Sequence, residues 1–132
     1  LCIEAEEEED FYLLKSLAEK LSDKIYYINS EQRQYLHMAA VFANNFTNHL
    51  YHIAHEICKE NMVSFDILHP LIAETAHKIT KLSPKEAQTG PARRNDKKTQ
   101  KKHTEMLKNR SQRELYELFS KLIADTYGRK KL

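Results

Sequence analysis

The chain has 132 residues, which is long enough for one domain with a hydrophobic core. Its 41% hydrophobic and 30% charged residues are those of a globular protein rather than of a disordered one. Two glycines and three prolines are too few for a sandwich or barrel of many short strands. No apolar run approaches the roughly 20 residues that a membrane-spanning helix needs, so we expect no membrane partner.

The N-terminal residues and the cysteines indicate a compartment. The N-terminus becomes acidic almost at once, which is not the pattern of a signal peptide. Cys2 and Cys58 match neither a metal-binding nor a redox spacing, so we expect reduced thiols in a cytoplasmic protein. The chain also starts inside an apparent core strand, which predicts that a further segment precedes it.

Charge is distributed unevenly along the chain. The net charge is +2 overall, but residues 1–30 carry a net −5 and residues 91–113 a net +7. Such a division can mark a nucleic-acid surface, although a solvated face or an anion-binding pocket is more common. The basic run lacks the interleaved aromatic side chains on which single strands stack, and it has no zinc-finger spacing. We therefore expect no nucleic-acid partner and keep such binding as the weaker alternative.

The first 28 residues follow a β-α-β order. Residues 1–5 and 24–28 have the composition of short strands. Between them, hydrophobic residues recur at helical spacing behind several acids, which suit a helix N-terminus. Two strands alone would be marginal, so the rest of such a sheet should lie elsewhere.

A long helix is predicted next, with Ser30 as its N-cap and its end near Glu60. Its hydrophobic residues form one apolar stripe. A helix this apolar should be buried against more than one neighbour, one of which a dimer partner could supply. The stripe consists of Leu36, Ala39, Ala43, Phe46, Leu50, Ile53 and Ile57.

Shorter helices fill the remainder of the chain. Ser64 should open one segment, with a break near His69 before Pro70. A capping box at residues 83–86 predicts a short helix that residues 89–91 end. Asn95 or Asp96 should cap the next helix, and a second capping box at residues 111–114 should open the last one.

Residues 89–96, Thr-Gly-Pro-Ala-Arg-Arg-Asn-Asp, form the most informative segment. Glycine before proline favours a tight loop, and the helix behind it directs free N–H groups toward that loop. Arg93 and Arg94 add donors suited to a carboxylate or phosphate. Spacing alone favours the simpler interpretation, an ordinary interhelical turn with solvated arginines.

Polar residues on the long helix are the other candidates. His49, His52 and His55 lie on adjacent turns with Glu56, but a single helix rarely completes a metal shell, so we predict no metal site. His37 and Asn45 lie two turns apart on an apolar helix. They could line a cleft against a neighbouring domain, or His37 could be a hydrogen-bonded core histidine, which is favoured without other information.

Three stretches together resemble one protein family. Residues 33–46 read Arg-Gln-Tyr-Leu-His-Met-Ala-Ala-Val-Phe-Ala-Asn-Asn-Phe, residues 68–71 read Leu-His-Pro-Leu and are followed by Glu74-Thr75, and residues 89–96 are the most specific part. They resemble Rossmann-like proteins described as NADP oxidoreductases, with a C-terminal helical domain of unknown function. These are distant relatives of ketopantoate reductase, pyrroline-5-carboxylate reductase and 6-phosphogluconate dehydrogenase.

The resemblance implies a mainly α fold, a helical bundle like the C-terminal domain of 6-phosphogluconate dehydrogenase, preceded by a short β-α-β remnant. Residues 1–29 would end the dinucleotide-binding domain, and residues 30–132 would dimerise and close over a small-molecule substrate. NADP would bind through the upstream domain, not through this chain. Related dehydrogenases place a catalytic lysine ahead of asparagine on the long helix, whereas this chain has His37 ahead of Asn44, Asn45 and Asn48.

These patterns lead to one site hypothesis and two functional readings. His37 and Asn45 are the predicted catalytic residues, and substrate is predicted to bind at Thr89, Gly90, Pro91 and Arg94, all in one cleft facing the nucleotide domain. The leading reading is the dimerisation and substrate-closing domain of an NADP-dependent oxidoreductase of unknown substrate. The alternative is a non-catalytic dinucleotide-sensing or scaffold dimer.

Overall fold

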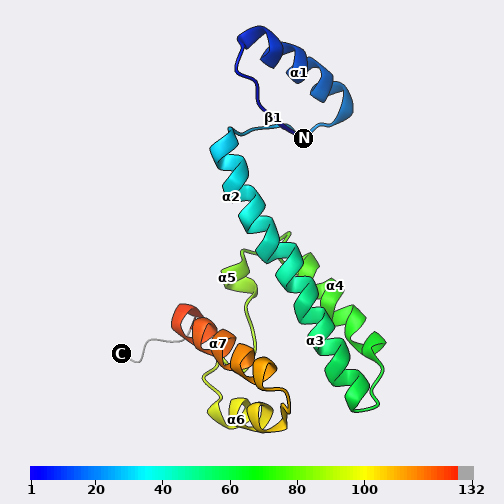
Figure 1. Ribbon diagram of the computed structural model, residues 1–132, viewed down its shortest axis with the longest axis vertical. Coiled ribbons are helices and arrows are strands. Elements are labelled where there is room, and N and C mark those ends of the chain that lie inside the picture. Colours follow the sequence, from blue (N-terminus) through cyan, green and yellow to red (C-terminus); the bar gives the residue numbers. More distant parts are fainter. Residues whose placement is uncertain (128–132) are drawn as a thin grey trace. The chain divides into compact units, whose positions relative to one another are not determined.

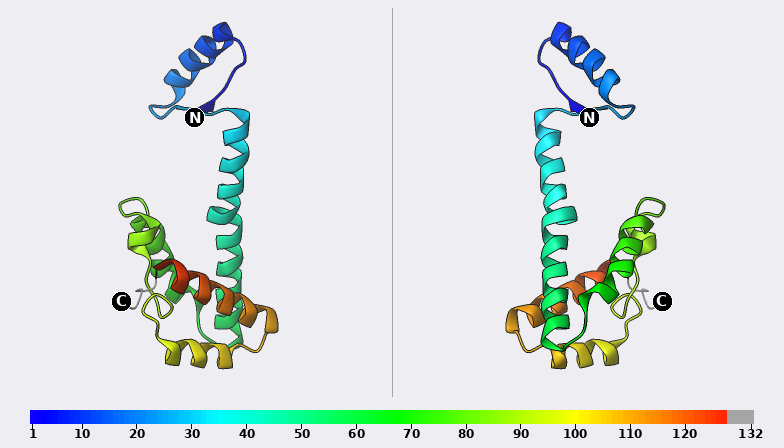
Figure 2. Two further views of the ribbon diagram at one scale, coloured as in Figure 1. Left: turned by 90° about the vertical axis from the view of Figure 1, so that its left-hand side faces the viewer. Right: turned by 90° about the vertical axis from the view of Figure 1, so that its right-hand side faces the viewer.

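The structure is a computed structural model that describes residues 1–127. It divides into two units, Leu1–His52 and Ile53–Leu132. The division falls within the long helix, which Figures 1 and 2 draw from several sides. The domain boundary expected between residues 29 and 30 stays a prediction.

The first unit opens with the β-α-β order expected from the sequence. Strand β1 (Cys2–Ile3) pairs in parallel with β2 (Tyr26–Tyr27), Cys2 opposite Tyr26, and helix α1 (Glu8–Leu21) connects them (Figure 1). Three acidic residues in the first turn of α1 complement the positive end of the helix dipole. The prediction of a parallel pair joined by a helix is confirmed.

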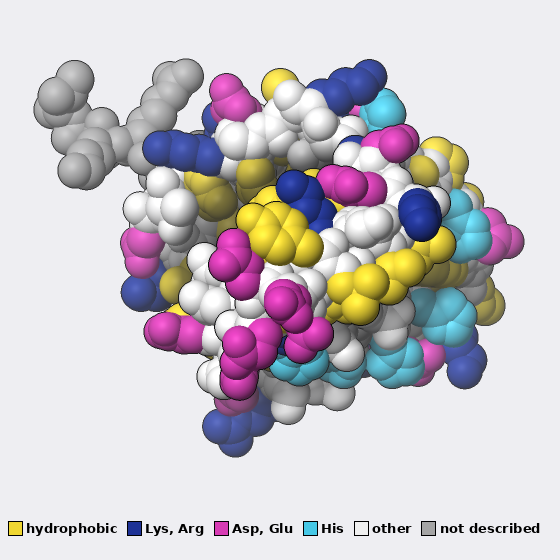
Figure 3. Space-filling view, turned by 90° about the horizontal axis from the view of Figure 1, so that it is seen from above, with side chains coloured by type: hydrophobic (Ala, Val, Ile, Leu, Met, Phe, Trp, Pro, Cys, Tyr) yellow, Lys and Arg dark blue, Asp and Glu magenta, His cyan; other side chains and the backbone are white. Residues whose placement is uncertain are grey.

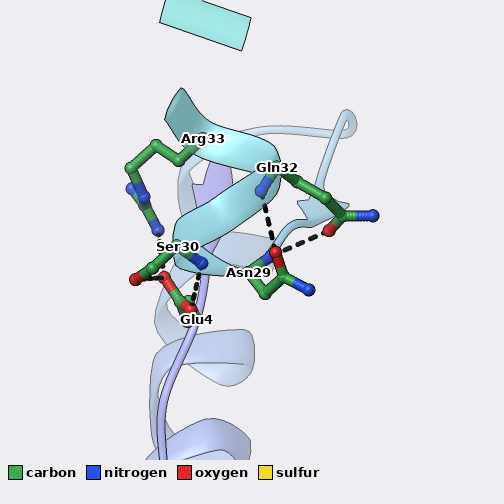
Figure 4. Close-up of polar contacts among 5 residues, drawn as sticks. All are labelled: Glu4, Asn29, Ser30, Gln32 and Arg33. Atoms are coloured by element: carbon green, nitrogen blue, oxygen red, sulfur yellow. Dashed lines mark hydrogen bonds and ion pairs between the residues drawn. The ribbon is translucent and has the colours of Figure 1, made fainter. Parts of the chain in front are cut away.

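The long helix consists of α2 (Ser30–Ala40), the π-helical segment η1 (Val41–Phe46) and α3 (Thr47–Glu60). The predicted cap is off by one residue, because Asn29 rather than Ser30 caps α2. Asn29 Oδ1 accepts from the backbone N–H of Gln32 at 2.8 Å, and Gln32 Oε1 accepts from that of Asn29 at 2.9 Å (Figure 4). This reciprocal pair is a capping box in which Asn and Gln replace the usual Ser and Glu.

Glu4 joins the end of β1 to the start of α2. Its carboxylate accepts from the Ser30 backbone N–H at 2.5 Å, from Ser30 Oγ at 3.0 Å and from Arg33 Nη2 at 3.0 Å (Figure 4). Desolvation raises the pKa of Glu4, but the hydrogen bonds from Arg33 and Ser30 outweigh it and hold the pKa below its ordinary value. An anion at a helix N-terminus is also favoured by the helix dipole.

The π-helical segment changes the faces of the long helix. An i→i+5 turn accommodates one residue more than an α turn, so residues after η1 are displaced by about 100° from their places in a regular helix. The single stripe predicted from Leu36 to Ile57 assumed regular winding and is therefore wrong. Leu36 and Ala39 lie on one face, whereas Leu50 and Ile53 lie on another.

This chain does not bury the long helix. No residue of α2, η1 or α3 is buried, so the expected burial against several neighbours is not provided within the described residues. Leu36 is 51% exposed and Phe42 64%. Hydrophobic side chains are accordingly visible at the surface in Figure 3.

The second unit contains the remaining helices. Ser64 caps the 3-10 helix η2 (Phe65–Leu68), which passes into α4 (His69–Lys78) with Pro70 in its first turn, so the backbone changes helix type near His69 as it continues. The capping box of Ser83 and Glu86 opens α5 (Pro84–Ala87), as predicted. Helices α6 (Lys97–Met106) and α7 (Arg110–Tyr127) contact each other.

The predicted start of the last helix is wrong. Helix α7 begins at Arg110, and the Asn109 side chain accepts from the backbone N–H of Gln112 at 3.2 Å, so Ser111 lies inside the helix. Glu114 was expected to complete the capping box. Its Oε1 instead lies 2.7 Å from Arg110 Nε, one turn earlier in the same helix. Within residues 1–127, no helix is long and apolar enough to cross a membrane.

The lowered pKa of Glu4 leads us to expect a specific pH dependence of the free energy of unfolding. Its lowered folded-state pKa means that its contribution is complete above the ordinary carboxylate pKa and is lost as the pH falls through the folded value. The Glu4→Gln substitution should therefore lower the free energy of unfolding most at neutral pH, and its effect should become smaller as the pH falls. Urea unfolding at several pH values measures this, with Glu6→Gln as the control. A loss that is equal at neutral and acid pH would contradict the role assigned to Glu4.

Candidate functional site

Residues 89–91 form the tight loop that the Gly-Pro sequence predicted. Gly90 has a φ of 105°, a backbone conformation that residues with a side chain rarely adopt. The chain then closes on itself, because the backbone N–H of Asp96 donates to the Pro91 carbonyl at 2.9 Å. Ala92 inside this turn is only 6% exposed, so it anchors the loop to the second unit.

Asp96 is the cap of α6, one of the two residues predicted for that role. Its carboxylate accepts from the backbone N–H of Thr99 at 3.0 Å and from Thr99 Oγ1 at 2.7 Å. These two hydrogen bonds lower the pKa of Asp96, and the charges of Arg94 and Lys98 add to the effect. Asn95 has a φ of 57°, in the left-handed region where asparagine is more common than most other residues.

The two arginines of the loop differ in their surroundings. Arg93 is half-buried, and its guanidinium donates to the backbone carbonyl of Gln88 and, at 3.5 Å, to that of Glu86. Arg94 is exposed. Arg93 therefore braces the loop through backbone carbonyls, and the role predicted for Arg94 as a substrate-binding residue stays a prediction.

His37 and Asn45 are both exposed, His37 in the last turn of α2 and Asn45 in η1. In a regular helix, eight residues rotate by about 800°, which would place them roughly 80° apart. With the additional residue of the π turn, the rotation is about 700°, within roughly 20° of two full turns. The winding of η1 therefore aligns the two side chains along one row of the helix.

The predicted site residues fall in different units. His37 and Asn45 belong to Leu1–His52, whereas Thr89, Gly90, Pro91 and Arg94 belong to Ile53–Leu132. The cleft that the two sets were predicted to share stays a prediction.

The histidines farther along the long helix form local pairs. The rings of His49 and His52 lie 6.0 Å apart, and His55 Nδ1 lies 3.3 Å from Glu56 Oε1. In the part of the chain that the structure describes, no group of three or more His, Cys, Asp and Glu side chains could hold a metal ion.

The second unit also contains a pocket that the sequence did not reveal. His103 Nδ1 lies 2.9 Å from the Tyr116 hydroxyl, and both side chains line a cavity of about 340 Å³. The two residues are 13 positions apart on different helices, so no local pattern relates them. Neither His103 nor Tyr116 is among the site residues predicted from the sequence.

A short parallel β-α-β unit followed by helices makes this a mainly α structure. The chain belongs to the family described as a domain of unknown function, DUF2520, whose model matches residues 1–123. No curated protein matches it.

Two solved structures are similar to this chain. The crystal structure of a "putative NADP oxidoreductase" from Bacteroides fragilis is 47% identical with a TM-score of 0.85, over 94% of this chain and 48% of that one. A protein from Thermotoga maritima is 27% identical with a TM-score of 0.78, over 92% of this chain and 50% of that one. The chain thus spans about half the length of these structures.

Gly90 and Asn95 form a matched pair for testing the loop. Gly90→Ala should lower the free energy of unfolding by about 1–2 kcal/mol, because a Cβ disfavours positive φ although no neighbouring atom lies within 4 Å of it. Asn95→Gly should change it little, since glycine adopts a φ of 57° without a steric cost. Urea unfolding measures both, and equal effects of the two changes would contradict the loop conformation described above.

Proposed function

We propose that this chain is the dimerisation and substrate-closing domain of an NADP-dependent oxidoreductase that acts in the cytoplasm. The observation that supports an oxidoreductase is the 47% identity to a structure named as a "putative NADP oxidoreductase", over 94% of this chain. NADP would be held by a part of the protein outside this chain. The two glycines, Gly90 and Gly128, are too far apart for the glycine-rich turn that approaches a pyrophosphate.

His37 and Asn45 supply the chemistry in this proposal. A reductase needs a proton donor beside the nicotinamide, and histidine titrates near neutral pH. Asn45 would orient a substrate carbonyl or imine by hydrogen bonding. The two residues lie about 12 Å apart along the helix axis, so they would contact different groups of one substrate.

The loop supplies binding rather than chemistry. Arg94 would hold an anionic group of the substrate by a two-pronged contact, and residues 89–91 would shape the pocket around that group. Arg93 is engaged by the Gln88 carbonyl and fixes the loop for this purpose. The substrate is therefore a small anionic carbonyl or imine compound.

Dimerisation is proposed from the exposed hydrophobic surface. Leu36, Phe42 and Phe46 are exposed on the long helix at 51%, 64% and 49%. Large apolar side chains exposed in this number often mark an interface, and most soluble oligomers are symmetric pairs. Leu36→Asp should therefore weaken a homodimer, while Ile67→Asp on η2 should not. Sedimentation equilibrium measures both variants.

The replacement of the expected lysine by His37 favours a second candidate, a non-catalytic dinucleotide-sensing or scaffold dimer. Such a protein would bind NADPH and dimerise without oxidising it. Turnover with any carbonyl or imine substrate separates the two readings.

The His37→Ala variant tests the leading proposal. It should abolish NADPH oxidation, because the proton donor is lost, and leave the dimer mass unchanged. His52→Ala is the matched control, since His52 is another exposed histidine of the same helix. Absorbance at the NADPH band with a panel of anionic carbonyl and imine compounds measures the rate. If His37→Ala and His52→Ala are equally active, His37 is not the proton donor.

A further inference from the structure

The π-helical segment η1 lies at the two residues proposed for catalysis, His37 and Asn45. π-helical turns are rare, occur singly inside α-helices and are frequent at functional sites. This one covers Val41–Phe46 and therefore contains Asn45 and follows His37 by one turn. The part of it that precedes Asn45 is what places the two residues in one row.

Specific contacts hold the turn. Thr47 Oγ1 donates to the carbonyl of Phe42, five residues earlier, at 3.1 Å. The rings of Phe42 and Phe46 meet edge to face with centroids 4.9 Å apart. The ordinary arrangement occurs in α4, where Thr75 Oγ1 donates to the Leu71 carbonyl, four residues earlier, at 2.8 Å. Thr47 thus satisfies a carbonyl that belongs to the wider turn.

We infer that η1 is a positioning element for the proposed site and that Thr47 is its positioning residue, through which Asn45 is aligned with His37. The inference rests on the proposed function for its catalytic consequence but not for its geometry. Thr47 itself contacts no substrate. If the turn relaxes to regular winding, Asn45 moves roughly 80° out of line with His37.

The geometry is tested without activity, by cross-linking in the full protein. In a background with Cys2→Ser and Cys58→Ser, the changes His37→Cys and Asn45→Cys create two thiols on one row. A bismaleimide of about 12 Å spans two helical turns on one face. We expect rapid intramolecular cross-linking and slower cross-linking when Thr47→Val is added. Cross-linking that is slow from the start, or unaffected by Thr47→Val, would overturn the inference.

A one-residue deletion gives a second, compensating test. Without Ala43, the residues at positions 37 and 45 are seven apart, and regular winding then aligns them without a π turn. The deletion should therefore preserve fast cross-linking and make it insensitive to Thr47→Val. A deletion that folds and dimerises but abolishes cross-linking would contradict the alignment argument.

The catalytic consequence is measured by steady-state kinetics of the protein with native His37 and Asn45. Thr47→Val should lower kcat by about 2- to 12-fold, the range for one neutral hydrogen bond, without a matching rise in KM for NADPH. Thr47→Ser should restore kcat, and Thr75→Val should have no such effect. If His37→Ala leaves the rate unchanged, the proposed function fails, while the cross-linking result still decides the geometry. If His37 is essential but Thr47→Val behaves like Thr75→Val, the positioning role alone fails.

Discussion

Scarcity of buried hydrophobic surface is the constraint on which the rest of this structure depends. Among the described residues, only Ala18 and Ala92 are buried hydrophobic side chains, whereas Leu21 is 78% and Ile67 69% exposed. Full burial of a leucine or isoleucine contributes about 1.5–3 kcal/mol, so this surface represents a large unused stabilisation. Local interactions therefore define the elements, and we propose that further protein surface covers them.

The local interactions are mostly helix caps. Asn29 with Gln32, Ser83 with Glu86, and Asp96 with Thr99 each satisfy N–H groups at the start of a helix. Glu4 extends this pattern across the chain, because it joins the first strand to the N-terminus of the long helix. Caps determine where helices begin, but they do not cover the apolar faces of those helices. The helices are therefore well formed and still expose hydrophobic side chains.

The parts that the sequence predicted correctly are those with strong local signals. The parallel β-α-β unit, the capping box at Ser83 and the loop at Gly90 all rest on residues whose preferences agree with one another. The two cap errors arose where neighbouring residues were both good caps: Asn29 beside Ser30, and Asn109 near Ser111. In each case the asparagine occupies the cap, and the serine lies inside the helix.

The π turn and the His103–Tyr116 pair could not be predicted from the sequence for different reasons. The predicted stripe assumed 3.6 residues in every turn of the helix. One additional residue in the π turn moves Leu50 and the residues after it to another face. The spacing of the hydrophobic residues in the sequence gives no sign of that shift. His103 and Tyr116 come from separate helices, and only the packing of α6 on α7 brings them within 2.9 Å. For the candidate site, His37, Asn45 and Arg94 are all exposed, and the cleft that they were predicted to share stays a prediction.

The central claim is that other protein surface covers the long helix in the working protein. Photochemical carbene footprinting of the whole protein tests it most directly, with each residue normalised to its labelling in urea. The account predicts low labelling at Leu36 and Phe42, which this chain leaves 51% and 64% exposed, and high labelling at Met62, which is 96% exposed in the turn after α3. Labelling of Leu36 and Phe42 as strong as that of Met62 would contradict it.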